Sequence, residues 1–381
     1  MKRIISLILS LAMVSAFSLT AFAQNDEGEL SLTCKAAVLM DPCTGTVLYS
    51  VDPEARLPEA SITKVMTLLL VFEALDSGKI KLEDKVTCSA HAAGMGGSQI
   101  WLREGEVMTV GELIKAAAVG SANDASVALA EYIAGSHEAF VTMMNDRARQ
   151  LGMKQTSYKN CTGLDAEGHL TSALDVAIVA SELIKHEKIF DYSTIWMDSL
   201  RNGELQLNNT NKLLKQYDGI TGLKTGTTSQ AGCCICATAQ RDGMELIAVI
   251  LGAPNSKTRF AEAKKLLDYG FANWETVDAA DYVPSMTDIE VKAGIERSVP
   301  VCAVMEGRLL IEKGSREKIN VSVSCAENVT APVEAGQTVG SVTLSADGRK
   351  LGEYPVVTCS STGRVTFAAA FICLLKSMLS M

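Results

Sequence analysis

The chain has 381 residues, 48% of them apolar, which is about twice the length of a typical single domain and enough to fill a large core. Its formal charge of −9, from 44 acidic and 35 basic residues, argues against a nucleic-acid-binding protein. The four histidines, His91, His137, His169 and His186, stand in no metal-ligand or Ser-His-Asp pattern, so we predict neither a metal nor a cofactor.

The N-terminus has the pattern of a signal peptide. Lys2 and Arg3 precede an apolar stretch from 4 to 21, and the small-residue sequence A-F-A ends at Ala23. We predict cleavage after Ala23 and export from the cell, with an uncleaved membrane anchor as the alternative.

The first chemical motif is S-I-T-K, which opens a predicted buried helix. Residues 58–60 interrupt any regular element before them. Ser61 then begins an apolar run that continues to Leu75 and stops at Gly78. Lys64 follows Ser61 by three residues, so both side chains project from one face. A serine becomes a nucleophile when a base takes its proton, and burial together with a second cation lowers the pKa of a lysine. We therefore predict Ser61 as nucleophile and Lys64 as base, against a serine cap followed by a solvated lysine.

The second motif, S-A-N, falls between two predicted helices. Helical spacing covers 110–119, Gly120 interrupts it, and a new run extends from Asn123 to Gly135. Ser121 and Asn123 are therefore expected on a turn. A hydroxyl there can relay a proton to a leaving group, and the amide can hold a substrate carbonyl while bonding Lys64. Ordinary helix capping is the alternative.

The third motif is K-T-G, formed by Lys224, Thr225 and Gly226, and it is expected on a strand beside a cleft. Two further strand-like runs follow, 233–238 and 246–251, separated by a turn. The lysine supplies positive charge for a substrate carboxylate, the threonine a hydroxyl donor, and the glycine room for a substrate backbone.

Residues 276–362 lose helical periodicity and show short β-branched runs separated by glycine turns, which predicts a small antiparallel β domain.

The last stretch, 365–381, gathers apolar side chains on one side of a helix and is too short to span a bilayer comfortably. An interfacial amphipathic helix that holds the protein to a membrane surface fits this pattern, and a disordered tail or a partner-docking helix is the alternative.

Eleven cysteines are unusual for an exported chain. Cys233, Cys234 and Cys236 crowd one predicted strand, where the role of small buried apolar residues is favoured. Cys34 and Cys43 are spaced to close a small loop, whereas unpaired cysteines would suit a reducing habitat. The sequence leaves both open.

Each motif alone is a weak signal, because S-x-x-K recurs at 315–318 in a region expected as strand and turn. The three motifs in this order, separated by about 60 and about 100 residues, are far more specific. Together they form the set found in penicillin-recognising serine enzymes. The chain resembles the D-alanyl-D-alanine carboxypeptidases among the low-molecular-mass penicillin-binding proteins. The further matching segments are 163–165, 171–175, 211–214 and 258–260.

The resemblance implies an α/β (α+β) fold of the β-lactamase and transpeptidase type, with an antiparallel sheet flanked by helices, followed by a small all-β domain. It implies that Arg259 helps to bind the terminal carboxylate of the substrate, and that the backbone N–H groups of Ser61 and Thr227 form an oxyanion hole. Thr227 departs modestly from the aromatic or histidine that members often carry there.

The resemblance also sets the expected organisation and partners of the chain. We expect a signal peptide at 1–23, a catalytic domain at 24–275, a β domain at 276–362 and a membrane-anchor helix at 363–381. The implied substrates are peptidoglycan stem peptides ending in D-Ala-D-Ala, and β-lactams are implied as covalent inhibitors. The implied location is the outer face of the bacterial cytoplasmic membrane, reached through the C-terminal helix.

Two other functions stay open. A class A β-lactamase shares the motifs but needs a glutamate that activates the deacylating water, and no glutamate between the second and third motifs has the E-x-x-L-N context of those enzymes. The candidates are Glu131, Glu138, Glu167, Glu182, Glu187 and Glu204. A non-catalytic penicillin- or muropeptide-binding protein is the third possibility, and it would be favoured if a motif residue were missing.

Overall fold

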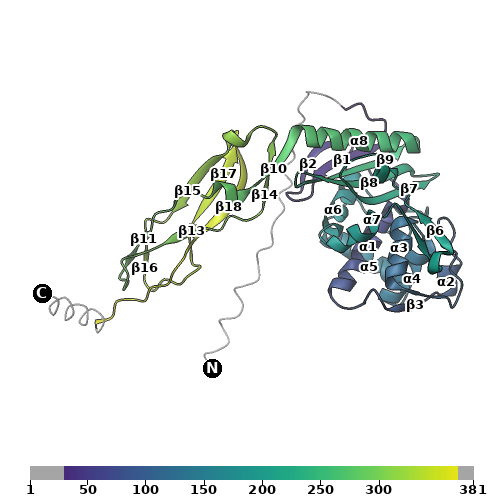
Figure 1. Ribbon diagram of the computed structural model, residues 1–381, viewed down its shortest axis with the longest axis horizontal. Helices are drawn as coiled ribbons and strands as arrows, with labels where there is room; N and C mark the ends of the chain where they lie inside the picture. Colours follow the sequence, from purple (N-terminus) through teal and green to yellow (C-terminus); the bar gives the residue numbers. More distant parts are fainter. Residues whose placement is uncertain (1–29, 368–381) are drawn as a thin grey trace. The chain divides into compact units, whose positions relative to one another are not determined.

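The computed structural model describes residues 30–367 and divides the chain into two compact units, Met1–Gly270 (unit 1) and Phe271–Met381 (unit 2). Figure 1 shows the elements of both units. The predicted signal peptide and nearly all of the predicted C-terminal anchor lie outside the described residues. From 30 to 367, no helix combines the length and the apolar character needed to cross a bilayer.

Unit 1 is built on a five-stranded sheet in the order β2-β1-β9-β8-β7, with every neighbouring pair antiparallel. The strands are β1 (Ala36–Asp41), β2 (Thr46–Val51), β7 (Ile220–Thr228), β8 (Gly232–Arg241) and β9 (Met244–Ala253). Among the strands of residues 30–367, the K-T-G strand β7 pairs with β8 alone, so it is an edge strand. An edge strand is the kind of element to which an extended peptide can add.

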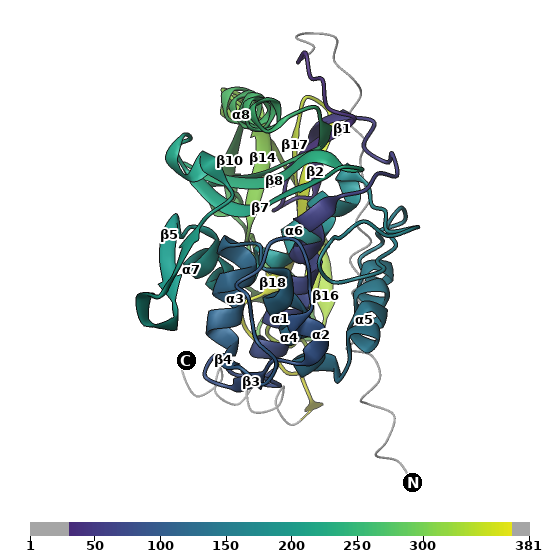
Figure 2. The same cartoon turned by 90° about the vertical axis from the view of Figure 1, so that its right-hand side faces the viewer.

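Helices cover both faces of this sheet, as Figure 2 shows, with α8 on one face and the remaining long helices beyond the other. A Cβ at Gly270 of α8 would meet Leu246 and Leu39 of the sheet, so this helix packs closely on β9 and β1. The helices are α1 (Lys64–Asp76), α2 (Ala90–Ala93), α3 (Val110–Val119), α4 (Asn123–Ala134), α5 (His137–Gln150), α6 (Ala173–Leu183), α7 (Phe190–Ser193) and α8 (Ser256–Asn273). Two small hairpins complete unit 1: β3 (Lys85–Thr87) with β4 (Val107–Thr109), and β5 (Met197–Leu200) with β6 (Leu205–Asn208).

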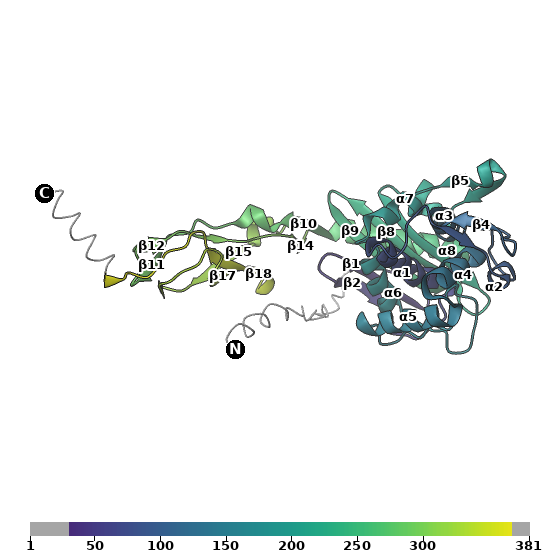
Figure 3. The same ribbon diagram turned by 90° about the horizontal axis from the view of Figure 1, so that it is seen from below.

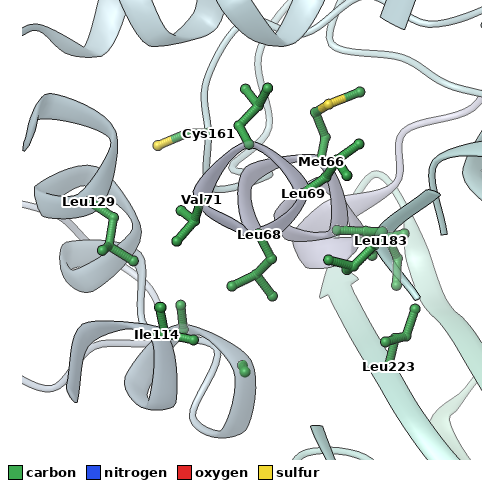
Figure 4. Packing of buried hydrophobic residues seen from close by; sticks show 14 of the residues in the cluster. Met66, Leu68, Leu69, Val71, Ile114, Leu129, Cys161, Leu183 and Leu223 are labelled. Atoms are coloured by element: carbon green, nitrogen blue, oxygen red, sulfur yellow. The ribbon is translucent and has the colours of Figure 1, made fainter. Parts of the chain in front are cut away.

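The predicted buried helix is α1, which is apolar on all sides because other elements surround it. Figure 4 shows its side chains pointing outward in several directions toward α3, α4, α6 and β7. Leu69 is fully buried, and burying such a side chain contributes roughly 1.5–3 kcal/mol. The helix ends where expected, because Gly78 has a φ of 72° that favours glycine. This central position fixes the residues at the N-terminus of α1.

Unit 2 is all-β, as predicted, and most of its strands are antiparallel. Its four-stranded sheet has the order β13-β18-β17-β15, and Figure 3 shows β15, β17 and β18 together. One pair, β11 with β16, is parallel, which the sequence did not predict. The strands are β10 (Trp274–Asp278), β11 (Ile289–Lys292), β12 (Ser298–Val299), β13 (Val301–Ala303), β14 (Arg308–Glu312), β15 (Asn320–Cys325), β16 (Asn328–Thr330), β17 (Thr338–Ala346) and β18 (Arg349–Thr358).

The second S-x-x-K match lies in unit 2, on the short 3-10 turn Arg316–Lys318. Lys318 is exposed there and forms an ion pair with Asp347 at 3.1 Å. The structure therefore separates this match from the motif at Ser61.

Residues 30–367 contain no disulfide. Cys34 and Cys43 lie at the two ends of the extended strand β1, which holds them much farther apart than the roughly 7 Å that a disulfide allows between Cα atoms. The suggested small loop is therefore wrong. Cys234 and Cys236 are fully buried as expected, whereas Cys233 is partly exposed.

Candidate active site

Ser61 and Lys64 lie at the junction of two helical turns. Ser61 belongs to the 3-10 turn Ala60–Thr63, and Lys64 is the first residue of α1. The sequence predicted a single helix starting at Ser61, whereas the structure has a tighter 3-10 turn before the helix begins. This turn still brings the two side chains together, because Lys64 Nζ lies 3.1 Å from Ser61 Oγ. A nucleophile and a nitrogen base are thus within hydrogen-bond distance.

Lys64 is completely buried and its amine has three hydrogen-bond acceptors. Besides Ser61, Nζ donates to Asn123 Oδ1 at 2.6 Å and to the carbonyl of Thr162 at 2.7 Å. Burial lowers the pKa of Lys64 from 10.5 to about 7, and this outweighs the opposing influence of Cys161 and Asp124. The neutral amine needed by a base is therefore well populated near neutral pH.

The S-A-N motif reaches this amine from the start of α4. Ser121 lies in the connection between α3 and α4 with a φ of 60°, while Asn123 is the first residue of α4. Only Ser121 is therefore on the predicted turn. Asn123 is held on its other side as well, since its Nδ2 donates to the carbonyl of Gly96 at 2.7 Å. Its side-chain oxygen is fixed toward Lys64 as a result.

The K-T-G strand β7 passes directly beside the nucleophile. A Cβ at Gly226 would lie 2.8 Å from both Ser61 N and Glu59 O, which is closer than atoms can approach. Glycine is therefore required by the close approach itself. This contact brings the backbone of Thr227 next to that of Ser61, as an oxyanion hole requires.

Three basic side chains, Lys64, Lys224 and Arg259, lie near one another at β7. Lys224 is buried, and burial lowers its pKa well below the usual range, with Lys64 and Arg259 adding repulsion. Thr225 Oγ1 donates to Thr210 Oγ1 at 2.7 Å. A substrate carboxylate beside Lys224 and Arg259 would offset this repulsion and favour the charged form of Lys224.

Arg259 reaches β7 from the first turns of α8. Its Nη1 donates to the carbonyl of Gly226 at 2.9 Å and to Thr227 Oγ1 at 3.0 Å. The side chain is 6% exposed, and its Nε has no partner among residues 30–367. The structure thus brings Arg259 and Thr227 into contact, as residues of one subsite should be.

Sequence reasoning missed a buried polar group behind the nucleophile. Thr63 Oγ1 lies 3.0 Å from Glu59 Oε1 and 2.8 Å from His169 Nε2. The backbone N–H of Lys159 donates to His169 Nδ1, so the neutral ring carries its proton on Nε2. Burial raises the pKa of Glu59 to about 8 and lowers that of His169 to about 4, which favours the neutral form of each near pH 7. The pair braces the turn that holds Ser61.

A second missed contributor is the loop at 162–170. Gly163 has a φ of 83°, and a Cβ there would lie 1.8 Å from the Ala60 carbonyl oxygen. A small pocket of about 100 Å³ separates this loop from residues 58–60. The match of 163–165 to the family pattern pointed to this loop in the sequence. The hydrogen bond from Lys64 to the Thr162 carbonyl could not be predicted, because it involves no side chain of Thr162.

Comparison with known proteins agrees with this geometry. A family model described as D-alanyl-D-alanine carboxypeptidase matches residues 22–255, and one described as penicillin-binding protein 5, C-terminal domain, matches 275–363. The D-alanyl-D-alanine carboxypeptidase DacF of Bacillus subtilis (strain 168) is 43% identical over 96% of this chain and 97% of its own length.

Solved structures are also similar to this chain. Penicillin-binding protein 5 of Haemophilus influenzae aligns with a TM-score of 0.77 and 32% identity, covering 88% of this chain and 99% of that one. Penicillin-binding protein D2 of Listeria monocytogenes, solved with ampicillin bound, aligns with a TM-score of 0.59 and 30% identity over 64% of this chain and all of that one. The chain therefore belongs to the D-alanyl-D-alanine carboxypeptidases, a family of serine peptidases.

Proposed function

We propose that this enzyme removes the terminal D-alanine from peptidoglycan stem peptides through an acyl-enzyme on Ser61. The observation that carries the proposal is the pairing of the Ser61 hydroxyl with a buried amine 3.1 Å away, whose pKa is lowered to about 7. A lysine that is neutral near physiological pH can accept the serine proton, which an exposed lysine cannot.

The reaction has two stages. Neutral Lys64 takes the hydroxyl proton of Ser61, and Ser61 Oγ bonds to the carbonyl carbon between the two D-alanines. The C–N bond then breaks, and D-alanine leaves after its amine receives a proton relayed through Ser121. Water hydrolyses the resulting ester and returns the proton to Ser61. Asn123 holds Lys64 and the substrate carbonyl during these steps.

The edge of β7 orients the substrate. The backbone N–H groups of Ser61 and Thr227 stabilise the oxyanion, and the approach of Gly226 to Ser61 supports this arrangement. Lys224, Thr225 and Arg259 bind the terminal carboxylate, because they supply positive charge and a hydroxyl donor at the same strand.

β-Lactams would follow the same route and stop at the acyl stage. Their amide carbonyl would acylate Ser61, and their carboxylate would occupy the subsite formed by Lys224 and Arg259. The ampicillin-bound structure of the similar Listeria protein supports this part of the proposal. No observation favours a β-lactamase, since the three partners of Lys64 are Ser61, Asn123 and Thr162 and none is a glutamate.

The proposal also includes the limits of the two domains and the location of the enzyme. We place the catalytic domain at 24–275 and the β domain at 276–362, and the start of the second family model at 275 supports this division. An exported enzyme held to the outer face of the cytoplasmic membrane by 363–381 follows from the sequence pattern alone. Deletion of 364–381 should release active enzyme from washed membranes, and retention of the truncated form there would contradict the anchor.

The direct test is release of D-alanine from diacylated L-Lys-D-Ala-D-Ala, comparing wild type with Ser61→Ala. We expect release to vanish with Ser61 and to survive in Ser315→Ala, because Ser315 begins the second S-x-x-K match in unit 2. Absence of release by folded wild type would overturn the proposal. Rapid turnover of a β-lactam in that case would identify a β-lactamase, and a stable adduct would identify a binding protein.

A further inference from the structure

Trp101 is an exposed aromatic residue in a backbone conformation that tryptophan rarely adopts. Its side chain is 65% exposed and its φ is 54°, in the left-handed region. Exposing a large apolar surface and holding such a conformation both oppose stability unless neighbouring contacts enforce them. Two residues near the nucleophile share this unusual φ range: Ala60, which precedes Ser61, and Ser121 of the second motif.

Two ionisable side chains, the buried Asp124 and the partly exposed Arg201, hold the loop that carries Trp101. The carboxylate of Asp124, which is fully buried, accepts hydrogen bonds from the N–H groups of Ile100 and Leu102, both at 3.0 Å. On the other side, Arg201 donates from Nη1 to the carbonyl of Ile100 at 2.8 Å and from Nη2 to that of Trp101 at 3.4 Å. The buried neighbours Ile100 and Leu102 leave the indole directed outward.

The same loop is attached to the active site. Asn123 donates its backbone N–H to the carbonyl of Ser98 and its side-chain amide to that of Gly96, both at 2.7 Å. Trp101 follows Ser98 by three residues, which span at most about 10 Å of chain. Trp101 is therefore only three residues from a residue that is hydrogen-bonded to Asn123, which positions Lys64.

We propose that Trp101 binds the part of a muropeptide upstream of the cleaved bond, and so gives the enzyme a preference for long natural substrates over short peptides. This inference rests on the proposed carboxypeptidase function. The D-alanine end is assigned to Lys224 and Arg259 on β7 and α8, whereas the loop of Trp101 is fixed to α4. An exposed indole on a backbone that is already held in place binds carbon-rich chains or sugar faces at a lower entropic cost than one on a free loop.

The test compares kcat/KM for three substrates: diacylated L-Lys-D-Ala-D-Ala, the free stem pentapeptide and the muramyl pentapeptide. For Trp101→Ala we expect about a fivefold to tenfold loss on the muramyl pentapeptide, mainly through KM, as one lost aromatic contact would give. Activity on the diacylated tripeptide should stay within about twofold of wild type, since that substrate lacks the upstream part. Trp101→Phe should retain most of the preference.

The matched control is Tyr132→Ala, because Tyr132 is another exposed aromatic residue of unit 1, about 13 Å farther along α4 from Asn123. This variant should match wild type on all three substrates. Loss that begins with the pentapeptide assigns the contact to the peptide, and loss confined to the muramyl form assigns it to the sugar. An equal loss on all three substrates, or no loss on the muramyl pentapeptide, would overturn the inference. Failure of wild type on the tripeptide would instead overturn the proposed function.

Discussion

The acylation rate should follow the protonation of Lys64. Lowering its pKa from 10.5 to about 7 corresponds to about 5 kcal/mol of preference for the neutral amine, caused by complete burial. Below pH 7 the neutral fraction falls tenfold for each pH unit, so acylation at pH 5 should be roughly a hundredfold slower than the plateau above pH 8.

The assay is the second-order rate constant for labelling by a fluorescent penicillin between pH 5 and 9. Glu59 is the necessary control, because burial raises its pKa to about 8 and it lies two residues from Ser61. Glu59→Gln should leave the midpoint near 7 if Lys64 is the titrating base. A midpoint above 9, a rate independent of pH, or a midpoint that moves with Glu59→Gln would refute the assignment.

The lowered pKa of Lys64 also makes the free energy of unfolding depend on pH. The folded state releases the Lys64 proton near pH 7, while the unfolded chain keeps it to about 10.5. Between these values the unfolded state binds more protons, so the free energy of unfolding rises with pH. Relative to Lys64→Met, wild type should gain about 2 kcal/mol between pH 7 and 9.

Two further predictions concern the turn that carries Ser61. The folded state keeps Glu59 protonated until about pH 8, whereas the unfolded chain releases this proton near 4.5, so this carboxyl costs stability increasingly as pH rises from about 4.5 to about 8. Glu59→Gln should therefore melt above wild type by a margin that is larger at pH 8 than at pH 5 in thermal unfolding, and a constant margin would contradict the raised pKa. Gly226→Ala should lose penicillin acylation by about a hundredfold or more while remaining folded by circular dichroism, because its Cβ would lie 2.8 Å from Ser61 N and displace the oxyanion hole. Gly96→Ala, where a Cβ meets nothing within 4 Å, is the matched control.

Local patterns predicted the elements that carry the three motifs well. The apolar run after Ser61 became α1, and the interruption at Gly120 separates α3 from α4 as expected. These signals depend on periodicity and on turn residues, which act over a few positions. The same patterns could not show that Ser61 lies in a 3-10 turn, since that geometry depends on contacts with Gly163 and Gly226 from distant parts of the chain.

Sequence reasoning failed where a contact involves the backbone or joins residues far apart. The carbonyl of Thr162 binds Lys64, and any residue type supplies a carbonyl. His169 was set aside because it stands in no recognisable pattern, yet the fold places it against Thr63 of the first motif. The parallel pair β11 and β16 was also missed, because strand direction depends on connections that short β-branched runs do not specify.

The strand order of unit 1 constrains how this enzyme can be made. Strand β1 lies between β2 and β9, although β9 is separated from it by almost the whole length of the unit. During synthesis from the N-terminus, the nucleophile cannot meet β7 before residue 226 has emerged, and one side of β1 stays unpaired until residues 244–253 have emerged. Such distant pairings fold slowly and leave an apolar edge open in the meantime. Unit 1 therefore exposes an unpaired strand edge while it is being made, and it becomes chemically competent only when nearly all of its residues are present.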